Sequence, residues 1–96
     1  LSLNKNGHYL EFDFEAQCHS VFQNVKSVLE SCGARWENLV DITVFLTNME
    51  RDFPVYNRVY ASYFPDEPAP CRTTLGISSL PTPIAIELKC IAWIPD

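Results

Sequence analysis

Two charged side chains stand in strand-like runs that otherwise suit burial. Arg72 opens the run that follows a proline-rich stretch, and Glu87 lies between Ile86 and Leu88 in the last apolar run. A guanidinium presents a planar fork of donors that matches a carboxylate through two parallel hydrogen bonds. A partly buried carboxyl can take up and release a proton near neutral pH. The two residues therefore indicate a small site that holds an acid and moves a proton.

Both residues also have an ordinary structural interpretation. Arg72 could pair on the surface with Asp66 or Glu67, since such exposed ion pairs are common. Glu87 could instead form an ion pair with Lys89, two positions further along the same run. The spacing alone leaves both interpretations open.

Other polar residues add little by their spacing. Asn57 lies among the aromatic positions of an expected helix, where it could donate to a substrate oxygen or simply face solvent. His8 and His19 have no partner at a spacing typical of a site, so we assign neither a role. Cys71 stands beside Arg72 without a basic histidine nearby, which argues against a nucleophilic thiol.

The composition indicates one modest, acidic domain that spans residues 1–96. The chain is 47% hydrophobic and 20% charged, with a net charge of -5. No apolar run approaches the roughly 20 residues that a membrane span needs. The basic residues are scattered, which argues against a nucleic-acid partner. Because the chain begins with Leu1 rather than methionine, we expect a fragment or a processed form.

The four cysteines predict neither a zinc site nor a disulfide framework. They contain no C-x-x-C pair and have no cluster of histidines beside them, so we expect no metal. Cys18 and Cys32 fall on the apolar stripe of an expected helix, and Cys90 falls on an apolar strand face. Buried thiols of this kind are typical of a reducing compartment. We therefore expect a cytoplasmic protein, with the mitochondrion as the other candidate.

Two helices are predicted from apolar residues that recur every three or four positions. The first runs from an N-cap at Asp13 to Gly33, with Gln17 on its polar face. Its apolar stripe consists of Cys18, Val21, Phe22, Val25, Val28, Leu29 and Cys32. The second has Asp52 as its N-cap and Pro54 in its first turn. Its buried stripe consists of Phe53, Tyr56, Val59, Tyr60 and Tyr63.

The remaining runs predict strands. They cover residues 39–47, 72–79 and 84–94, and a hairpin is expected around Asn6-Gly7. Strand, helix, strand order predicts a parallel crossover, and two amphipathic helices are best buried on one face of a sheet. The predicted fold is α+β: a two-layer sandwich with a mixed sheet and two helices on one face. The other face carries Glu87, Lys89 and Trp93, and we expect it to meet another subunit.

The order of these motifs resembles the RidA family, also called the YjgF family. The resemblance runs from about Glu15 to Trp93 and includes AQCHSVFQNVKSVLESCGA, LVDITVFLTNM, FPVYNRVYASYF, PAPCRTTLGISSLP and IAIELKCIA. It implies a chorismate-mutase-like fold and a homotrimer with sites in clefts between subunits. The family's N-terminal strands, which contribute a tyrosine and a serine to the site, have no counterpart in this chain. We therefore expect the N-terminus to be truncated.

The resemblance implies a role for each candidate residue. Arg72 matches the arginine that grips the substrate carboxylate, and Glu87 matches the glutamate that positions water and relays protons. Asn57 matches the helix asparagine near the site, and Thr74 stands at the substrate side in place of a family cysteine. Lys89 could engage a second carboxylate, since RTTLGISSLPTPIAIELKCIAW looks like the 2-aminomuconate deaminase branch.

The implied activity is the hydrolysis of enamine or imine acids to keto acids with release of ammonia, without a metal or organic cofactor. The alternative is a non-catalytic carboxylate-binding or regulatory protein on the same trimeric scaffold. Ribonuclease or translation-inhibitor activity has been attached to some relatives, but the acidic net charge makes RNA the least favoured partner.

Overall fold

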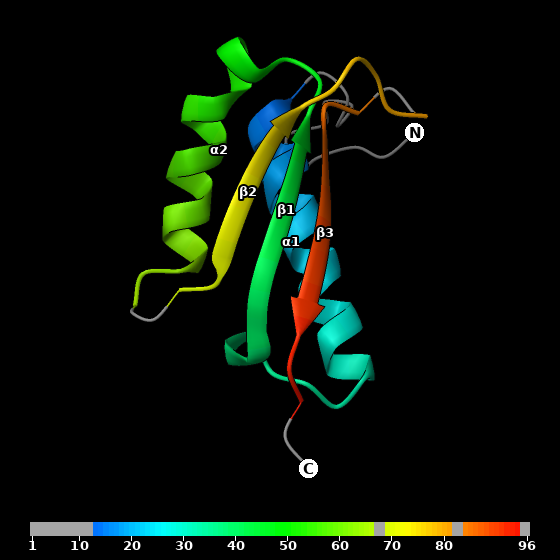
Figure 1. Ribbon diagram of the computed structural model, residues 1–96, viewed down its shortest axis with the longest axis vertical. Coiled ribbons are helices and arrows are strands. Elements are labelled where there is room, and N and C mark those ends of the chain that lie inside the picture. Colours follow the sequence, from blue (N-terminus) through cyan, green and yellow to red (C-terminus); the bar gives the residue numbers. More distant parts are fainter. Residues whose placement is uncertain (1–12, 67–68, 82–83, 95–96) are drawn as a thin grey trace.

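Two helices cover one face of a three-stranded sheet in the computed structural model, which describes residues 13–66, 69–81 and 84–94 (Figure 1). The strand order is β2-β1-β3. β1 (Leu39–Leu46) is central, β2 (Cys71–Gly76) runs parallel to it and β3 (Ile86–Ala92) runs antiparallel. This confirms the predicted two-layer sandwich with a mixed sheet. The hairpin expected around Asn6-Gly7 lies outside the described residues.

Helix α1 (Phe14–Ser31) begins and ends where the sequence predicts. The Oδ1 of Asp13 accepts the backbone N–H of Ala16 at 3.0 Å, which satisfies one of the free donors of the first turn. Gly33 follows the helix with φ of +76°, a conformation that glycine adopts without a Cβ clash. The chain can therefore turn sharply into the short 3-10 helix η2 (Trp36–Asn38) that leads to β1.

Two positions of α1 and its C-cap residue differ from the prediction. Val28 is 61% exposed and Cys32 is also exposed, so their predicted burial is wrong. Gln17, predicted on the polar face, is buried, and its Oε1 accepts the N–H of Ala85 at 2.8 Å. Its amide satisfies a backbone donor just before β3 that would otherwise need water. The hydropathy pattern placed Gln17 in solvent, because hydropathy takes no account of a hydrogen bond to a backbone group far along the chain.

Helix α2 (Met49–Tyr63) begins earlier than the sequence predicts. Its N-cap is Asn48, whose Oδ1 accepts the N–H of Arg51 at 3.1 Å. The predicted cap at Asp52 is therefore wrong. Asp52 is buried within the first turn and binds the Arg51 guanidinium at 2.8 Å. Pro54 consequently lies in the second turn rather than in the first.

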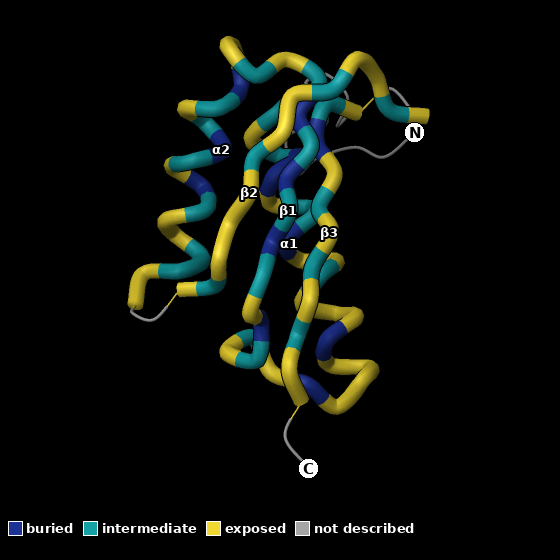
Figure 2. The backbone as a smooth tube through the Cα atoms, in the orientation of Figure 1, coloured by how far each residue is buried: buried dark blue, intermediate teal, exposed yellow. Residues whose placement is uncertain are grey.

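The core lies between β1 and the two helices (Figure 2). Ile42, Val44 and Leu46 alternate along β1 and are fully buried on this side. The rings of Phe22 from α1 and Tyr56 from α2 stack with centroids 6.1 Å apart above them. Both helices are therefore fixed to the same face of the sheet, as predicted.

The opposite face of the sheet is left uncovered by the described residues. Phe45 of β1 stands in register with Leu75 on β2 and with Glu87 on β3, so these three side chains share it. Ile91 is 51% exposed and Trp93 is 72% exposed. We call this surface the open face. Its exposed apolar side chains are of the kind that marks an interaction surface.

Candidate active site

Arg72 stands near the start of β2 and reaches across to α2. Its register partner on β1 is Ile42, which faces the helices, so the arginine side chain extends on the same side. Nη1 of Arg72 donates to Oδ1 of Asn57 at 2.5 Å. The structure thus brings together two of the residues that the sequence singles out. It does not pair Arg72 with Asp66, and Glu67 lies outside the described residues.

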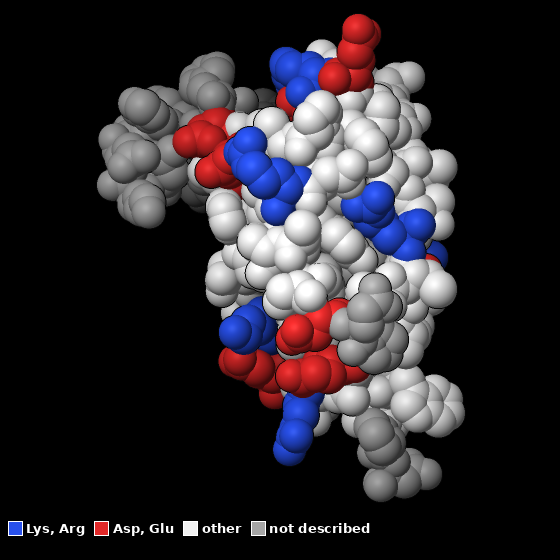
Figure 3. Space-filling view, turned by 90° about the vertical axis from the view of Figure 1, so that its left-hand side faces the viewer, with Lys and Arg blue, Asp and Glu red and all other residues white. Residues whose placement is uncertain are grey.

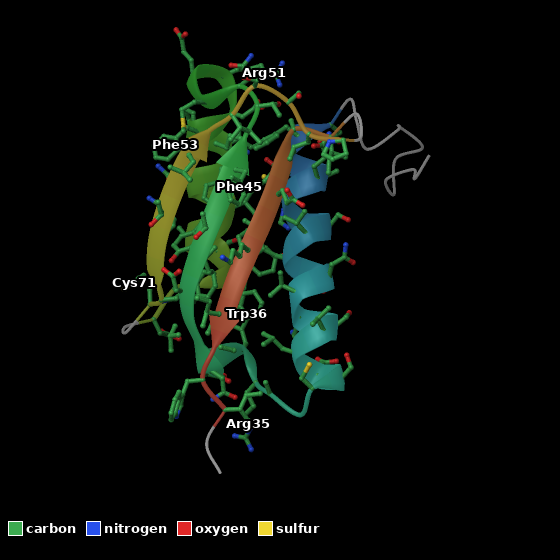
Figure 4. All side chains as sticks on the ribbon, turned by 45° about the vertical axis from the view of Figure 1, so that its right-hand side comes forward. Arg35, Trp36, Phe45, Arg51, Phe53 and Cys71 are labelled. Atoms are coloured by element: carbon green, nitrogen blue, oxygen red, sulfur yellow. The ribbon has the colours of Figure 1, made fainter. Side chains whose placement is uncertain are left out.

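Three aromatic rings of α2 surround the Arg72 guanidinium. Its Cζ lies 4.8 Å from the ring centroid of Tyr60 and 5.8 Å from those of Phe53 and Tyr56. Figure 4 shows Phe53 beside β2, the strand that carries Arg72. A cation over aromatic faces is attracted by the negative face of each ring. We call these three rings the aromatic cage.

Sequence reasoning placed the members of the aromatic cage in the core and missed their contact with Arg72. The signal that could have found them is helical spacing. Phe53 and Tyr60 lie four residues before and three after Asn57, so they share its side of α2, and Tyr56 lies about one turn from each of these two rings. A cation bound at Asn57 is therefore within reach of the three rings.

The guanidinium of Arg72 keeps donors free for a ligand. Arg72 is exposed, and within the described part of the chain Asn57 is its only hydrogen-bond partner. Nε and Nη2 together form one edge of the fork, and a carboxylate can accept from both. Asn57 thus fixes the group without consuming that edge.

Glu87 and Lys89 lie on the open face, away from Arg72. They stand opposite Phe45 and Thr43 of β1, and both are exposed. Strand β1 separates their strand from β2, and Arg72 extends from the other face of the sheet. A single chain therefore does not bring Arg72 and Glu87 together. Nor do Glu87 and Lys89 form an ion pair among the described residues.

Thr74 and Cys71 flank Arg72 along β2. Thr74 is half-buried, pairs in register with Val44 and extends on the same side as Arg72 two positions away. The Cys71 thiol is exposed and free. Thr74 is therefore close enough in the strand to contribute a hydroxyl beside the guanidinium.

A hollow of about 380 Å³ lies elsewhere, between α1 and β3. Only Asn24 and Glu87 among its lining residues are polar. Burial raises the pKa of its Cys90 thiol, which therefore stays protonated near neutral pH. With so few convergent polar groups, this hollow does not carry the chemistry of an acid substrate, and we place the candidate site at Arg72.

Neither a metal centre nor a membrane span is found in the portions of the chain that the structure describes. No three side chains among His, Cys, Asp and Glu gather there closely enough to hold a metal ion. None of the helices there has the length and apolarity to cross a bilayer.

Comparison with known proteins identifies the family. A family model described as Endoribonuclease L-PSP matches residues 1–94. The chain belongs to this family, the RidA family. A RutC family protein of Synechocystis is 38% identical over 85 residues, which are 88% of this chain and 65% of that protein. The Arabidopsis thaliana protein named Reactive Intermediate Deaminase A, chloroplastic, is 34% identical over 90 residues, 94% of this chain and 47% of its own.

Solved structures of the RidA family share the fold. RidA from the Antarctic bacterium Psychrobacter superposes with a TM-score of 0.82 at 30% identity, covering 96% of this chain and 73% of its own. Yeast Mmf1 superposes with a TM-score of 0.81 at 31% identity, covering 94% of this chain and 70% of its own. This chain therefore spans about half to three quarters of the length of these RidA relatives.

Proposed function

We propose that this chain hydrolyses enamine or imine acids to keto acids and releases ammonia. The observation that carries the proposal is the Arg72 guanidinium, fixed by Asn57 at 2.5 Å and by the aromatic cage, with one edge of its fork free. That edge suits the carboxylate that stands next to the C=N carbon of such substrates. The name of the Arabidopsis relative, a reactive intermediate deaminase, points to the same chemistry.

The proposed reaction uses the substrate carboxylate as a handle. Arg72 binds it and limits the freedom of the reactants, which lowers the entropic part of the barrier. Water adds to the C=N carbon while Glu87 accepts its proton. The carboxyl returns that proton to nitrogen, which gives a carbinolamine. A second proton then passes from the new hydroxyl to nitrogen by way of the carboxyl, the C=O bond forms as the C–N bond breaks, and ammonia and the keto acid leave. The balance is imine plus water to keto acid plus ammonia, so no metal or organic cofactor is required.

Glu87 would reach this site from a neighbouring subunit. Arg72 and Glu87 extend from opposite faces of one sheet, with β1 between their strands. The open face that carries Glu87 also exposes Leu75, Ile91 and Trp93, which would be covered by a second copy. A closed ring of three chains would place Glu87 of one chain beside Arg72 of the next at every seam. We therefore propose a homotrimer with its sites between subunits.

Within this chemistry, the positive charge of Lys89 on the open face favours 2-aminomuconate as the substrate. It carries two carboxylates, and Lys89 lies two positions from Glu87 on the same side of β3. Lys89 would hold the second carboxylate while Arg72 holds the first. Lys89→Ala should then slow turnover of 2-aminomuconate and spare 2-aminoacrylate, which has one carboxylate. Equal effects on both substrates would reject this role.

The second candidate function is carboxylate binding without turnover. The separation of Arg72 and Glu87 within one chain favours it, because an anchor without a proton relay binds an acid and leaves it unchanged. RNA cleavage is the least favoured activity. The face seen in Figure 3 carries separate basic and acidic groups rather than one basic surface, and the net charge is -5.

We further infer a reducing compartment, the cytoplasm or alternatively the mitochondrion. All four cysteines are free thiols, including the exposed Cys32 and Cys71. Disulfides are rare in such compartments, and exposed thiols persist there in the reduced form.

The direct experiment is an ammonia-release assay with 2-aminoacrylate and 2-aminomuconate. Wild type, Arg72→Ala and Glu87→Ala are compared, with pyruvate binding measured by calorimetry on each. The deaminase proposal expects turnover by wild type and none by either variant. Pyruvate binding without ammonia release would support the regulatory alternative and reject the enzyme. RNA cleavage that persists in both variants would come from elsewhere.

A further inference from the structure

We propose that Tyr60 is the positioning residue of this site and sets which edge of the Arg72 guanidinium meets a carboxylate. Its ring centroid lies 4.8 Å from Cζ of Arg72, nearer than the rings of Phe53 and Tyr56, both at 5.8 Å. A guanidinium attracted to a ring face loses rotational freedom. Its N–H donors all lie in its own plane, so a carboxylate binds it at an edge.

Tyr60 also holds the segment that leads into β2. Its hydroxyl donates to the carbonyl oxygen of Pro70 at 3.4 Å, two residues before Arg72. One side chain of α2 thus contacts both the guanidinium and the backbone that carries it. Burial raises the pKa of the Tyr60 phenol, against the opposing effect of the Arg72 charge. The hydroxyl therefore remains a donor at neutral pH.

Tyr60 and Asn57 restrain Arg72 in complementary ways. Nη1 of Arg72 donates to Oδ1 of Asn57, and the Tyr60 ring centroid lies 4.8 Å from Cζ of the guanidinium. Four N–H donors remain, one on Nε, one on Nη1 and two on Nη2, and Nε with Nη2 forms an edge of the fork that the bond to Asn57 does not use. We infer that the carboxylate is bound side-on, through Nε and Nη2. Side-on pairing leaves the bound acid in one orientation, as a reaction at its neighbouring carbon requires.

The kinetic part of the test rests on the proposed deaminase activity, whereas its spectroscopic part does not. Tyr60→Leu removes the ring, and Tyr60→Phe keeps the ring but loses the bond to Pro70. The matched controls are Tyr63→Leu and Tyr63→Phe. Tyr63 is one turn further along α2, stacks on Phe22 with centroids 4.6 Å apart, and bonds through its hydroxyl to His19 at 2.9 Å.

For Tyr60→Leu we expect KM for 2-aminoacrylate and Kd for pyruvate to rise together by about 3- to 20-fold, with a smaller change in kcat. Tyr60→Phe should stay within about 3-fold of wild type, because the ring is preserved. Both Tyr63 variants should match wild type in KM and Kd, whatever they do to stability. Equal changes in Tyr60→Leu and Tyr63→Leu would overturn the proposal.

Nitrogen-edited NMR of the arginine side chains decides the proposal even if wild type releases no ammonia. The Nε–H signal of Arg72 should carry a ring-current shift to which Tyr60 contributes, so Tyr60→Phe should retain the shift and Tyr60→Leu should reduce it. On adding pyruvate to wild type, the Nε–H signal should move downfield as it donates to the carboxylate. A signal that is identical in wild type and Tyr60→Leu would overturn the positioning role independently of catalysis.

Discussion

Asn57 of α2 fixes Arg72 of β2 through a hydrogen bond of 2.5 Å between Oδ1 and Nη1. The helix and the strand are separate elements that follow one another along the chain, and this bond joins them at the candidate site. A neutral amide suits the task, because it satisfies one donor of the guanidinium and leaves the positive charge uncompensated. The charge is then available to an acid ligand.

The first prediction replaces that amide by a carboxylate of almost the same shape. In Asn57→Asp the new carboxylate should pair with Arg72 and compete with the ligand, so Kd for pyruvate should rise about 10-fold or more. Asn57→Ala should have a smaller effect, since the charge of Arg72 stays free. Calorimetry on both variants measures the difference. A weaker effect for Asp than for Ala would contradict the proposed role of Asn57.

The second prediction separates the charge of Arg72 from its geometry. Arg72→Lys keeps the positive charge but cannot donate two parallel bonds to a carboxylate. We expect kcat/KM for 2-aminoacrylate to fall by about 10- to 100-fold, a partial loss in comparison with the inactive Arg72→Ala. The control is Arg58→Lys, because Arg58 is an exposed arginine of α2 paired only with Glu15 among the described residues. Full activity in Arg72→Lys would mean that charge alone suffices.

The fold was predictable because its elements carry strong periodic signals. The apolar repeat of α1, its Asp13 cap and Gly33 are local features, and each appears where expected. The β-branched run that became β1 is buried on the helix side and only partly exposed on the other, as expected of a central strand. Such features depend on residues that are close together in the sequence, so they can be recognised from the sequence of one chain alone.

The errors have two causes: a partner that is distant in the sequence, and neighbouring residues that are equally suited to one role. Gln17 is buried because Ala85, far along the chain, needs an acceptor. Asn48 rather than Asp52 caps α2, and Asp52 instead turns inward to bind Arg51. Either residue type can cap a helix, so the sequence did not discriminate between them.

The candidate site was predicted only in part for the same reason. Arg72 and Asn57 were singled out, and the structure joins them. The role of Tyr60 was missed, because a tyrosine on an apolar stripe is more often part of a core. Glu87 was expected to meet Arg72 at a junction between subunits, and within one chain the topology places the two on opposite faces of the sheet. Their meeting stays a prediction, because it depends on a second chain.

A third prediction concerns the buried hydroxyl of Tyr56. This side chain is fully buried, and its hydroxyl has no hydrogen-bond partner among the described residues. Tyr56→Phe removes an unsatisfied polar group and keeps the ring, so the free energy of unfolding should stay level or rise by about 1 kcal/mol. Urea denaturation measures it. A loss of more than about 1 kcal/mol would mean that the hydroxyl does have a partner.

The fourth prediction is a loss of stability in alkali that depends on Cys18. Burial, reinforced by Asp52 and Glu15, raises the pKa of its thiol from 9.0 to about 12. Between those values the unfolded chain has released this proton and the folded chain retains it. The free energy of unfolding should therefore fall as pH rises above 9, with Cys18 contributing about 1.4 kcal/mol per pH unit. Below pH 8 the thiol is protonated in both the folded and the unfolded chain, so Cys18 should no longer make the free energy of unfolding depend on pH.

The comparison for the Cys18 effect is Cys18→Ala, which has no thiol to titrate. Only slopes are compared, because the substitution also removes packing atoms. Urea midpoints between pH 8 and 10.5 should fall less steeply in the variant than in wild type. Cys90, whose pKa is also raised by burial, contributes equally to both proteins. Identical slopes would show that the Cys18 thiol titrates alike in the folded and unfolded chains.

The most direct test of the central claim mixes two inactive variants. If Arg72 of one chain works with Glu87 of its neighbour, Arg72→Ala and Glu87→Ala chains should each be inactive alone. Unfolded together and refolded in equal amounts, they should regain about one quarter of wild-type ammonia release, since about one seam in four then holds both native residues. No recovery in an oligomer that has demonstrably mixed would contradict a site shared between subunits.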